Sequence, residues 1–149
     1  MARNKKERSI GFPPLFTSFK PVGIGGRHLS KIVLTIDEYE AIRLADYEGY
    51  SHDDASKEMH ISRSTFTRLI EKARGKIAQM IILGNMITIE GGNIHFRSNI
   101  IKCNSCGYMF NIEIDRELKI CPNCKSTELF NLAGSFGHGK CCIEYFDNK

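Results

Sequence analysis

SHDDASKEMHISRSTFTRLI, residues 51–70, has the pattern of two helices joined by a tight turn. Ser51 and Ser62 each precede a helical stretch, where a serine hydroxyl can accept a hydrogen bond from a free backbone N–H of the first turn. His60 and Ile61 fall in the turn between the helices. Glycine is common at the position of His60, because the backbone there often needs a positive φ, which histidine tolerates better than most residues. We therefore predict a helix-turn-helix.

The second of these helices has an apolar and a polar face. Its apolar residues recur at helical spacing and predict a buried stripe of Phe66, Leu69, Ile70, Ala73, Ile77, Met80 and Ile81. The residues that point the opposite way are Ser64, Arg68, Glu71 and Gly75, flanked by Thr67 and Lys72. Residues 63–76 hold five bases and one acid, which suits the major groove of a duplex. The rival interpretation is an ordinary three-helix core with a solvated basic face.

The expected DNA contacts divide into base contacts and phosphate contacts. Arg68 is the first candidate for a base contact, because arginine can hold guanine through two hydrogen bonds. Lys72 and Arg74 suit phosphates, which position a protein without reading sequence. Residues 1–31 hold seven bases and one acid and are interrupted by glycine and proline, so we expect an irregular arm that adds phosphate or minor-groove contacts. The predicted DNA-binding residues are Arg63, Ser64, Thr67, Arg68, Lys72 and Arg74 in the helix and Arg3, Lys5 and Lys6 in the arm.

The flanking segments predict one further helix and a hairpin. Thr35 and Glu38 have the spacing of a capping box, so a first helix is expected from Thr35 to about Asp46. Residues 86–97 contain two strand-like runs of alternating polarity around Gly91-Gly92, a pattern typical of a β-hairpin.

A series of short motifs between residues 1 and 92 matches a known family. They are Arg3, Lys5-Lys6, Ile10-Gly11-Phe12, Pro14, Phe19-Lys20-Pro21, Gly23, Leu34-Thr35, Glu38, Glu40-Ala41, Arg43-Leu44-Ala45-Asp46, Ile61-Ser62-Arg63-Ser64-Thr65-Phe66, Arg68, Ala73-Arg74, Lys76 and Ile89-Glu90-Gly91-Gly92. In these motifs the chain resembles an uncharacterised prokaryotic family of predicted DNA-binding proteins, whose helix-turn-helix is similar to region 4 of bacterial sigma factors. The resemblance covers about three-fifths of the chain and implies DNA binding.

All six cysteines lie after residue 100, which indicates a second module. Two C-x2-C knuckles are separated by fourteen residues, the arrangement of a zinc ribbon, and their cysteines are Cys103, Cys106, Cys121 and Cys124. Four thiolates would complete a tetrahedral Zn²⁺ site without an open position, so a catalytic role is not expected. Iron is the alternative metal, because the knuckles resemble those of rubredoxin, although Lys125 stands where glycine usually follows the second pair.

The C-terminal tail contains three further soft ligands, His138, Cys141 and Cys142. They could form a second metal site, shared between subunits or not, or a redox-sensitive thiol pair. The alternative is a flexible tail whose thiols have no partner.

The composition excludes several classes of protein. The 149 residues are 42% hydrophobic and 26% charged, with a net charge of +4. No run approaches about eighteen apolar residues, and the N-terminus has no apolar stretch of a secretory signal, so we expect a cytoplasmic protein with no membrane contact. The P-loop, GxSxG and HExxH motifs are absent from the sequence, and we expect no enzyme activity.

Together these features predict an α+β protein of two modules, a mainly α helix-turn-helix domain and a small β zinc ribbon. Residues 1–31 would be the basic arm, 32–97 the helix-turn-helix domain with its hairpin, and 98–149 the zinc-ribbon module with its tail. The expected function is a sequence-specific transcriptional regulator bound to double-stranded DNA. A homodimer is favoured, because a lone helix-turn-helix usually needs a second copy, and the transcription machinery is a further expected partner. The alternatives are a protein-interaction adaptor and a metal or redox sensor that does not bind DNA.

Overall fold

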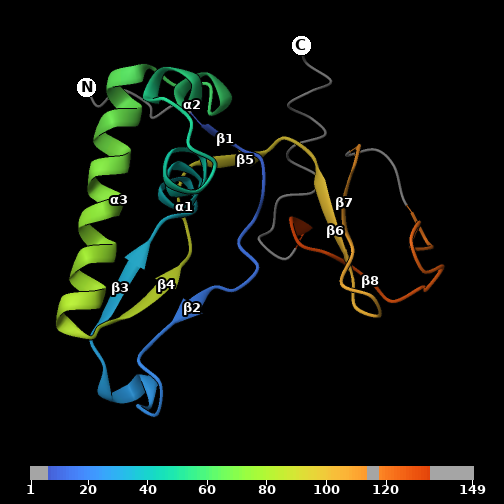
Figure 1. Ribbon diagram of the computed structural model, residues 1–149, viewed down its shortest axis with the longest axis horizontal. Coiled ribbons are helices and arrows are strands. Elements are labelled where there is room, and N and C mark those ends of the chain that lie inside the picture. Colours follow the sequence, from blue (N-terminus) through green and yellow to red (C-terminus); the bar gives the residue numbers. More distant parts are fainter. Residues whose placement is uncertain (1–6, 114–117, 135–149) are drawn as a thin grey trace. The chain divides into compact units, whose positions relative to one another are not determined.

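The computed structural model describes residues 7–113 and 118–134, and the fold is mixed α and β (Figure 1). The chain divides into two compact units. Unit 1 comprises Met1–Ile10 and Pro14–Ile94, and unit 2 comprises Gly11–Pro13 and His95–Lys149. No helix within the described residues is long and apolar enough to cross a membrane.

The helices of unit 1 begin where the serine caps predict. Helices α2 (His52–Glu58) and α3 (Arg63–Leu83) start after Ser51 and Ser62, whose hydroxyls accept hydrogen bonds from backbone N–H groups 3.1 Å and 3.2 Å away. Helix α1 (Ile36–Ile42) starts after Thr35 and continues into the π-helical turn η2 (Arg43–Tyr47). The capping box predicted there is wrong, because the Thr35 side chain makes no cap bond and Glu38 pairs with α3 instead.

A small sheet in unit 1 joins segments that are far apart in the sequence. Its order is β2 (Ser18–Phe19), β4 (Met86–Ile89) and β3 (Lys31–Leu34), with β4 antiparallel to β2 and parallel to β3. A 3-10 turn, η1 (Gly26–His28), separates β2 from β3, and α3 runs alongside β3 and β4 (Figure 1). The arm expected over residues 1–31 is therefore not irregular throughout, because β2 and β1 (Arg8–Ile10) both lie in it.

The hairpin predicted around Gly91-Gly92 does not form. Strand β4 pairs with β2 and β3, whereas the backbone before β5 (Ile94–Phe96) accepts a hydrogen bond from Arg8 of β1. The carbonyl of Gly91 accepts the backbone N–H of Ile36, so the two glycines carry the chain past the start of α1. Gly92 has a φ of 103°, and a Cβ there would lie 2.8 Å from a carboxylate oxygen of Asp37, so this position requires glycine.

The core of unit 1 covers only the first half of the predicted stripe on α3. Phe66, Ile70 and Ala73 are fully buried, and both α1 and α2 contact α3. Met80 is half-buried, and Ile81 is 68% exposed, so the apolar stripe continues beyond the part that the core covers.

Unit 2 contains one antiparallel sheet. Its order is β7 (Met109–Ile112), β6 (Asn99–Cys103) and β8 (Leu129–Asn131). The central strand β6 ends at Cys103, the first cysteine of the first knuckle, which is fully buried.

Candidate functional site

The α2–α3 pair is held at a fixed angle by contacts close to the turn. His60 has a φ of 55°, as the sequence predicts for this position, and the backbone N–H of Ile61 donates to the carbonyl of Ser56 over 3.0 Å. His52 Nδ1 lies 2.9 Å from Thr67 Oγ1, and its ring meets Phe66 edge-on at 5.4 Å between centroids. No local sequence pattern indicates this packing of His52, because only the pairing of the two helices brings it about.

The outward face of α3 presents three exposed cations near its N-terminal end. Arg63, Arg68 and Lys72 are all exposed, and within the described residues none of them has an ion-pair partner. Ser64 is exposed beside them, whereas Thr67 is half-buried and engaged by His52. This face is therefore a basic surface whose charges no acid among residues 7–113 and 118–134 neutralises.

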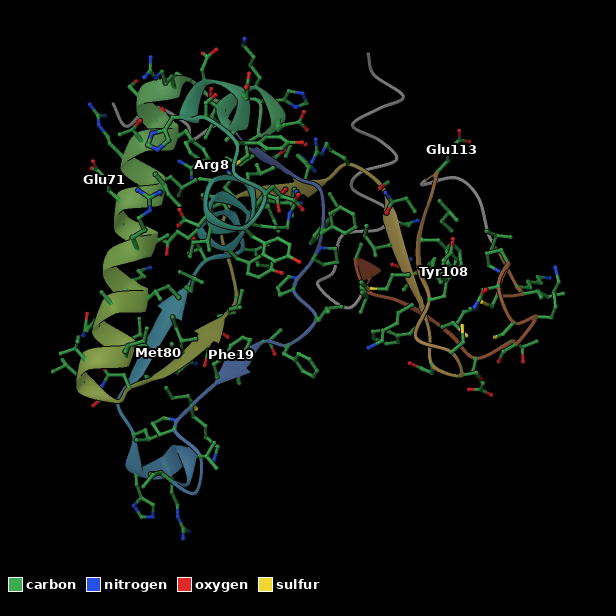
Figure 2. The ribbon with its side chains drawn as sticks, in the orientation of Figure 1. Arg8, Phe19, Glu71, Met80, Tyr108 and Glu113 are labelled. Carbon is green, nitrogen blue, oxygen red and sulfur yellow. The ribbon has the colours of Figure 1, made fainter. Side chains whose placement is uncertain are left out.

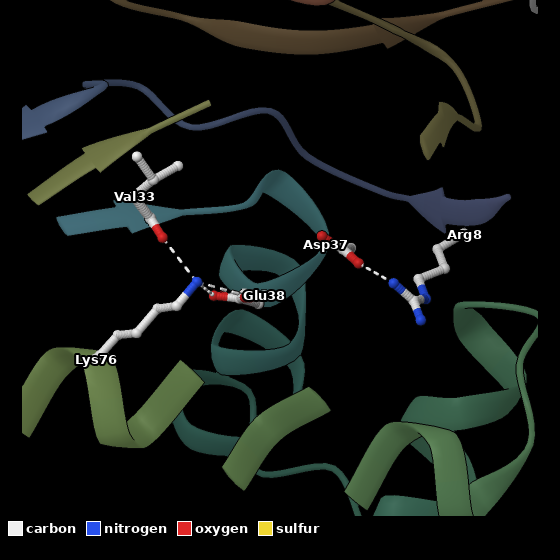
Figure 3. A network of polar contacts seen from close by, with 5 residues as sticks. All are labelled: Arg8, Val33, Asp37, Glu38 and Lys76. Atoms are coloured by element: carbon white, nitrogen blue, oxygen red, sulfur yellow. Dashed lines mark hydrogen bonds and ion pairs between the residues drawn. The ribbon is translucent and has the colours of Figure 1, made fainter. Parts of the chain in front are cut away.

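Two other bases of α3 are already paired. Arg74 donates two hydrogen bonds to Asp46, at 3.1 Å from Nε and 2.7 Å from a terminal nitrogen. The same hydrogen bonds lower the pKa of Asp46 below its ordinary value. Lys76 lies 2.8 Å from a carboxylate oxygen of Glu38 and donates to the carbonyl of Val33 over 2.7 Å (Figure 3). Of the five bases counted in this helix, Arg74 and Lys76 therefore tie α3 to the rest of unit 1.

One acid, Glu71, interrupts the basic face of α3. It is exposed, and Figure 2 shows it pointing away from the body of unit 1. A carboxylate in this place opposes the approach of a polyanion, so it reduces the attraction that Arg68 and Lys72 exert.

The four knuckle cysteines come together at one point. Their sulfur atoms all lie within 4.8 Å of one another, with 3.6 Å between Cys103 and Cys124 and 3.8 Å between Cys106 and Cys121. Four sulfurs about 2.3 Å from a Zn²⁺ ion would be about 3.8 Å apart in a tetrahedron, whereas a disulfide needs about 2.05 Å. The residues therefore fit a tetrahedral metal ion and could hold zinc.

The two knuckles have the same backbone geometry. Gly107 donates to the carbonyl of Cys103 over 2.8 Å, and Lys125 donates to the carbonyl of Cys121 over 2.9 Å. Both residues have a positive φ, 77° at Gly107 and 63° at Lys125. The lysine that departs from the usual glycine thus takes the conformation that glycine would take, at the cost of local backbone strain.

Hydrogen bonds favour the thiolate form of two of these cysteines. Asn123 Nδ2 donates to Cys106 Sγ over 3.5 Å and is the main reason that the pKa of Cys106 falls to about 6. The pKa of Cys103 is lowered mainly by the backbone N–H of Cys106. Thiolates are the form that binds a metal. The pKa of Cys124 moves the other way, to about 12, because the backbone hydrogen bond from Ser126 is outweighed by burial and by contacts with the three other cysteine side chains. Without a metal ion, the crowded cluster therefore does not hold all four groups as thiolates.

Six predicted site residues lie outside the described part of the chain. They are Arg3, Lys5 and Lys6 of the arm and His138, Cys141 and Cys142 of the tail.

Comparisons with known proteins identify a family. The family model described as "Protein of unknown function DUF134" matches residues 1–97. A UPF0251 protein of Chloroherpeton thalassium is 44% identical over 126 residues, which cover 85% of this chain and 83% of that protein. A UPF0251 protein of Pelotomaculum thermopropionicum is 40% identical, over 86% of this chain and 96% of that protein. A UPF0251 protein of Chlorobaculum tepidum is 37% identical, over 94% of this chain and 74% of that protein. No solved structure matches the chain.

Proposed function

Because this chain belongs to the DUF134 family, also called UPF0251, whose names give no activity, we propose its function from the geometry. We propose that it is a sequence-specific DNA-binding protein that regulates transcription. In this proposal α2, the turn at His60 and α3 form a helix-turn-helix similar to region 4 of sigma factors. The observation that carries the proposal is the set of exposed, unpaired cations at the start of α3, within the described residues.

The arrangement of the two helices supports major-groove binding. In a helix-turn-helix the second helix enters the groove by its N-terminal residues, while the first helix crosses the backbone. Arg63, Ser64 and Arg68 lie in the first two turns of α3 and are exposed. The positive end of the dipole of α3 is at the same end of the helix and would attract a DNA phosphate. Thr67 is half-buried and hydrogen-bonded to His52, so only part of the bonding capacity of its hydroxyl remains for a DNA contact.

The cysteine site is assigned a structural or sensory zinc ion, with iron as the alternative. Cys103, Cys106, Cys121 and Cys124 fill all four positions, so no position remains for a reacting water, and we propose no enzyme activity. When bound, zinc would supply the folding free energy that a three-stranded sheet of this size lacks.

Selection of bound fragments from a pool of random duplexes, followed by fluorescence anisotropy at several salt concentrations, tests the proposal. Arg68→Ala should weaken binding to the selected sequence by about 1–3 kcal/mol and reduce the preference for that sequence over random DNA. Lys72→Ala should weaken binding to all duplexes alike and reduce by about 1 the slope of the logarithm of the binding constant against the logarithm of the salt concentration. Lys119→Ala, which replaces an exposed lysine of unit 2, is the matched control and should change neither. Binding without any enriched sequence would refute the sequence-specific role.

A second candidate function is supported by unit 2. Tyr108, Met109 and Phe130 are exposed on a module with little core, which favours an adaptor that docks onto another protein, such as the transcription machinery.

A metal or redox sensor is the other alternative. If the chain shows no DNA binding at low salt yet releases zinc under mild oxidant, the sensor function replaces the regulator. Sedimentation of the free and DNA-bound protein tests the proposed homodimer.

A further inference from the structure

The last two turns of α3 are uncharged and largely exposed. Residues 77–83 contain no acidic or basic side chain. Ile77 and Met80 are half-buried, whereas Ile81, Ile82 and Leu83 are 68%, 79% and 67% exposed. Together these side chains surround the helix with apolar surface. A helical segment that is apolar all round is normally covered by other protein, and the core of unit 1 covers this one only in part.

A neighbouring loop extends this exposed surface. Pro21, in the loop after β2, lies against the end of α3, since a Cβ on Gly84 would be 3.9 Å from Pro21 Cγ. Val22 follows Pro21 and is fully exposed, and Ile24 is 44% exposed. Figure 1 shows this loop and the C-terminal end of α3 at the same end of unit 1. We call the five exposed aliphatic residues the apolar end, which consists of Val22, Ile24, Ile81, Ile82 and Leu83.

The size and the composition of the apolar end fit the centre of an interface between identical chains. At roughly 100 Å² of apolar surface for a whole aliphatic side chain, the exposed fractions leave about 350 Å² in contact with water. A stable dimer buries about 800 Å² on each copy, as an apolar centre within a polar rim. Interfaces between identical chains are also more apolar than those between transient partners. The apolar end therefore supplies the centre, and exposed polar residues beside it, such as Gln79 and Lys20, supply part of the rim.

We propose that a second copy of this chain covers the apolar end, in a two-fold symmetric pair. The same surface then lies on both sides of the interface, so each apolar residue gains an apolar partner and no complementary charges are needed. Arg68 lies about 21 Å from Ile82 along the helix axis, at 1.5 Å per residue, so the pairing leaves the start of α3 uncovered. This assigns a surface to the homodimer of the proposed function. The use of the pair to present two helix-turn-helices to one duplex rests on that function, whereas the pairing itself does not.

Sedimentation velocity of the zinc-loaded full chain, without DNA and over a range of concentrations, tests the pairing. The wild type should sediment as a dimer at micromolar concentrations. Ile82→Glu and Val22→Glu each place a carboxylate in the apolar centre, from two different segments, and should raise the dimer dissociation constant about thirtyfold or more. Neither residue belongs to the core, so circular dichroism at the helix band should match that of the wild type. Tyr47→Glu is the matched control and should leave the dissociation constant unchanged. Tyr47 is 84% exposed and precedes His52, which packs near the other end of α3.

The opposite results would overturn the assignment. A wild type that stays monomeric at its highest soluble concentration means that no second copy covers the apolar end. A dimer that persists in both Ile82→Glu and Val22→Glu uses another surface. Dissociation of Tyr47→Glu to the same extent means a general response to added charge.

An anionic lipid surface is the other occupant to test, because Lys20 and Arg27 are exposed in the same part of the chain. The probe is vesicles of phosphatidylcholine and phosphatidylserine. If a monomeric wild type sediments with these vesicles and Ile82→Glu does not, the apolar end binds lipid and the pairing is refuted. None of these measurements contains DNA, so a dimer that fails to bind any duplex refutes the proposed function and leaves the pairing intact.

Discussion

Replacing Lys76 with methionine removes the partner of a buried carboxylate and leaves most of the lysine's apolar volume in place. The Glu38 side chain is 3% exposed and that of Lys76 is 21% exposed, so the pair is largely excluded from solvent (Figure 3). The substitution also removes the hydrogen bond from Lys76 to the carbonyl of Val33. We therefore expect destabilisation of unit 1 as a structural effect, separate from any loss of DNA contacts.

The size of the effect follows from the exposure of the two side chains. Removing one partner of a buried pair typically costs about 3–5 kcal/mol, and the partial exposure of Lys76 places this case near the lower end, about 3 kcal/mol. For a unit of this size that corresponds to a fall in Tm of about 12 °C or more. Adding Glu38→Gln should recover about 2 kcal/mol, because the amide does not leave an uncompensated charge.

Urea denaturation followed by circular dichroism at the helix band measures the free energy of unfolding of unit 1, because the α-helices of the described residues all lie in that unit. Lys57→Met is the matched control, since Lys57 and Asp53 form an exposed pair on α2, and its midpoint should not move. A loss below about 1 kcal/mol for Lys76→Met, or a double variant as unstable as the single one, would refute the role assigned to the pair.

Three further outcomes are expected. Glu71→Gln should tighten binding to every duplex by a few-fold and steepen the salt dependence, because it removes a repulsive charge from the basic face; unchanged anisotropy curves would place DNA elsewhere. Arg74→Ala should lower the free energy of unfolding near neutral pH, because it removes the ion pair with Asp46. This loss should disappear as the pH falls through the lowered pKa of Asp46, since protonated Asp46 no longer forms an ion pair with Arg74. Melting curves that differ from those of the wild type by the same amount at every pH would contradict this. Lys125→Gly should slow the loss of zinc to a chelator, because glycine removes the strain of about 1 kcal/mol that a lysine has in the left-handed conformation. Faster loss would mean that the lysine side chain itself stabilises the knuckle.

The sequence predicts those features that depend on neighbouring residues. The serine caps of α2 and α3, the positive φ at His60 and the approach of the four cysteines all follow from local spacing, and the structure agrees with each. The metal itself, the helix-turn-helix assignment and the DNA contacts stay predictions.

Features that depend on distant partners were missed. Glu38 has the spacing of a capping residue, but Lys76, far along the chain, offers a stronger charged partner. The alternating run before Gly91 indicated a strand correctly, yet nothing local shows that β4 would pair in parallel with β3 rather than fold back. The hollow lined by Arg8, Asp37 and Lys72 likewise depends on three separate elements, β1, α1 and α3, which no motif encodes.

The position of β4 in its sheet has a consequence for the order of events during synthesis. Both of its neighbours, β2 and β3, precede it in the chain, and β4 is the central strand that each of them pairs with. A nascent chain that has emerged only as far as α3 therefore has two strands whose backbone groups have no partner. We expect the ribosome-bound N-terminal segment to stay unfolded and protease-sensitive until Ile89 has left the exit tunnel, and then to acquire its tertiary structure in a single late step.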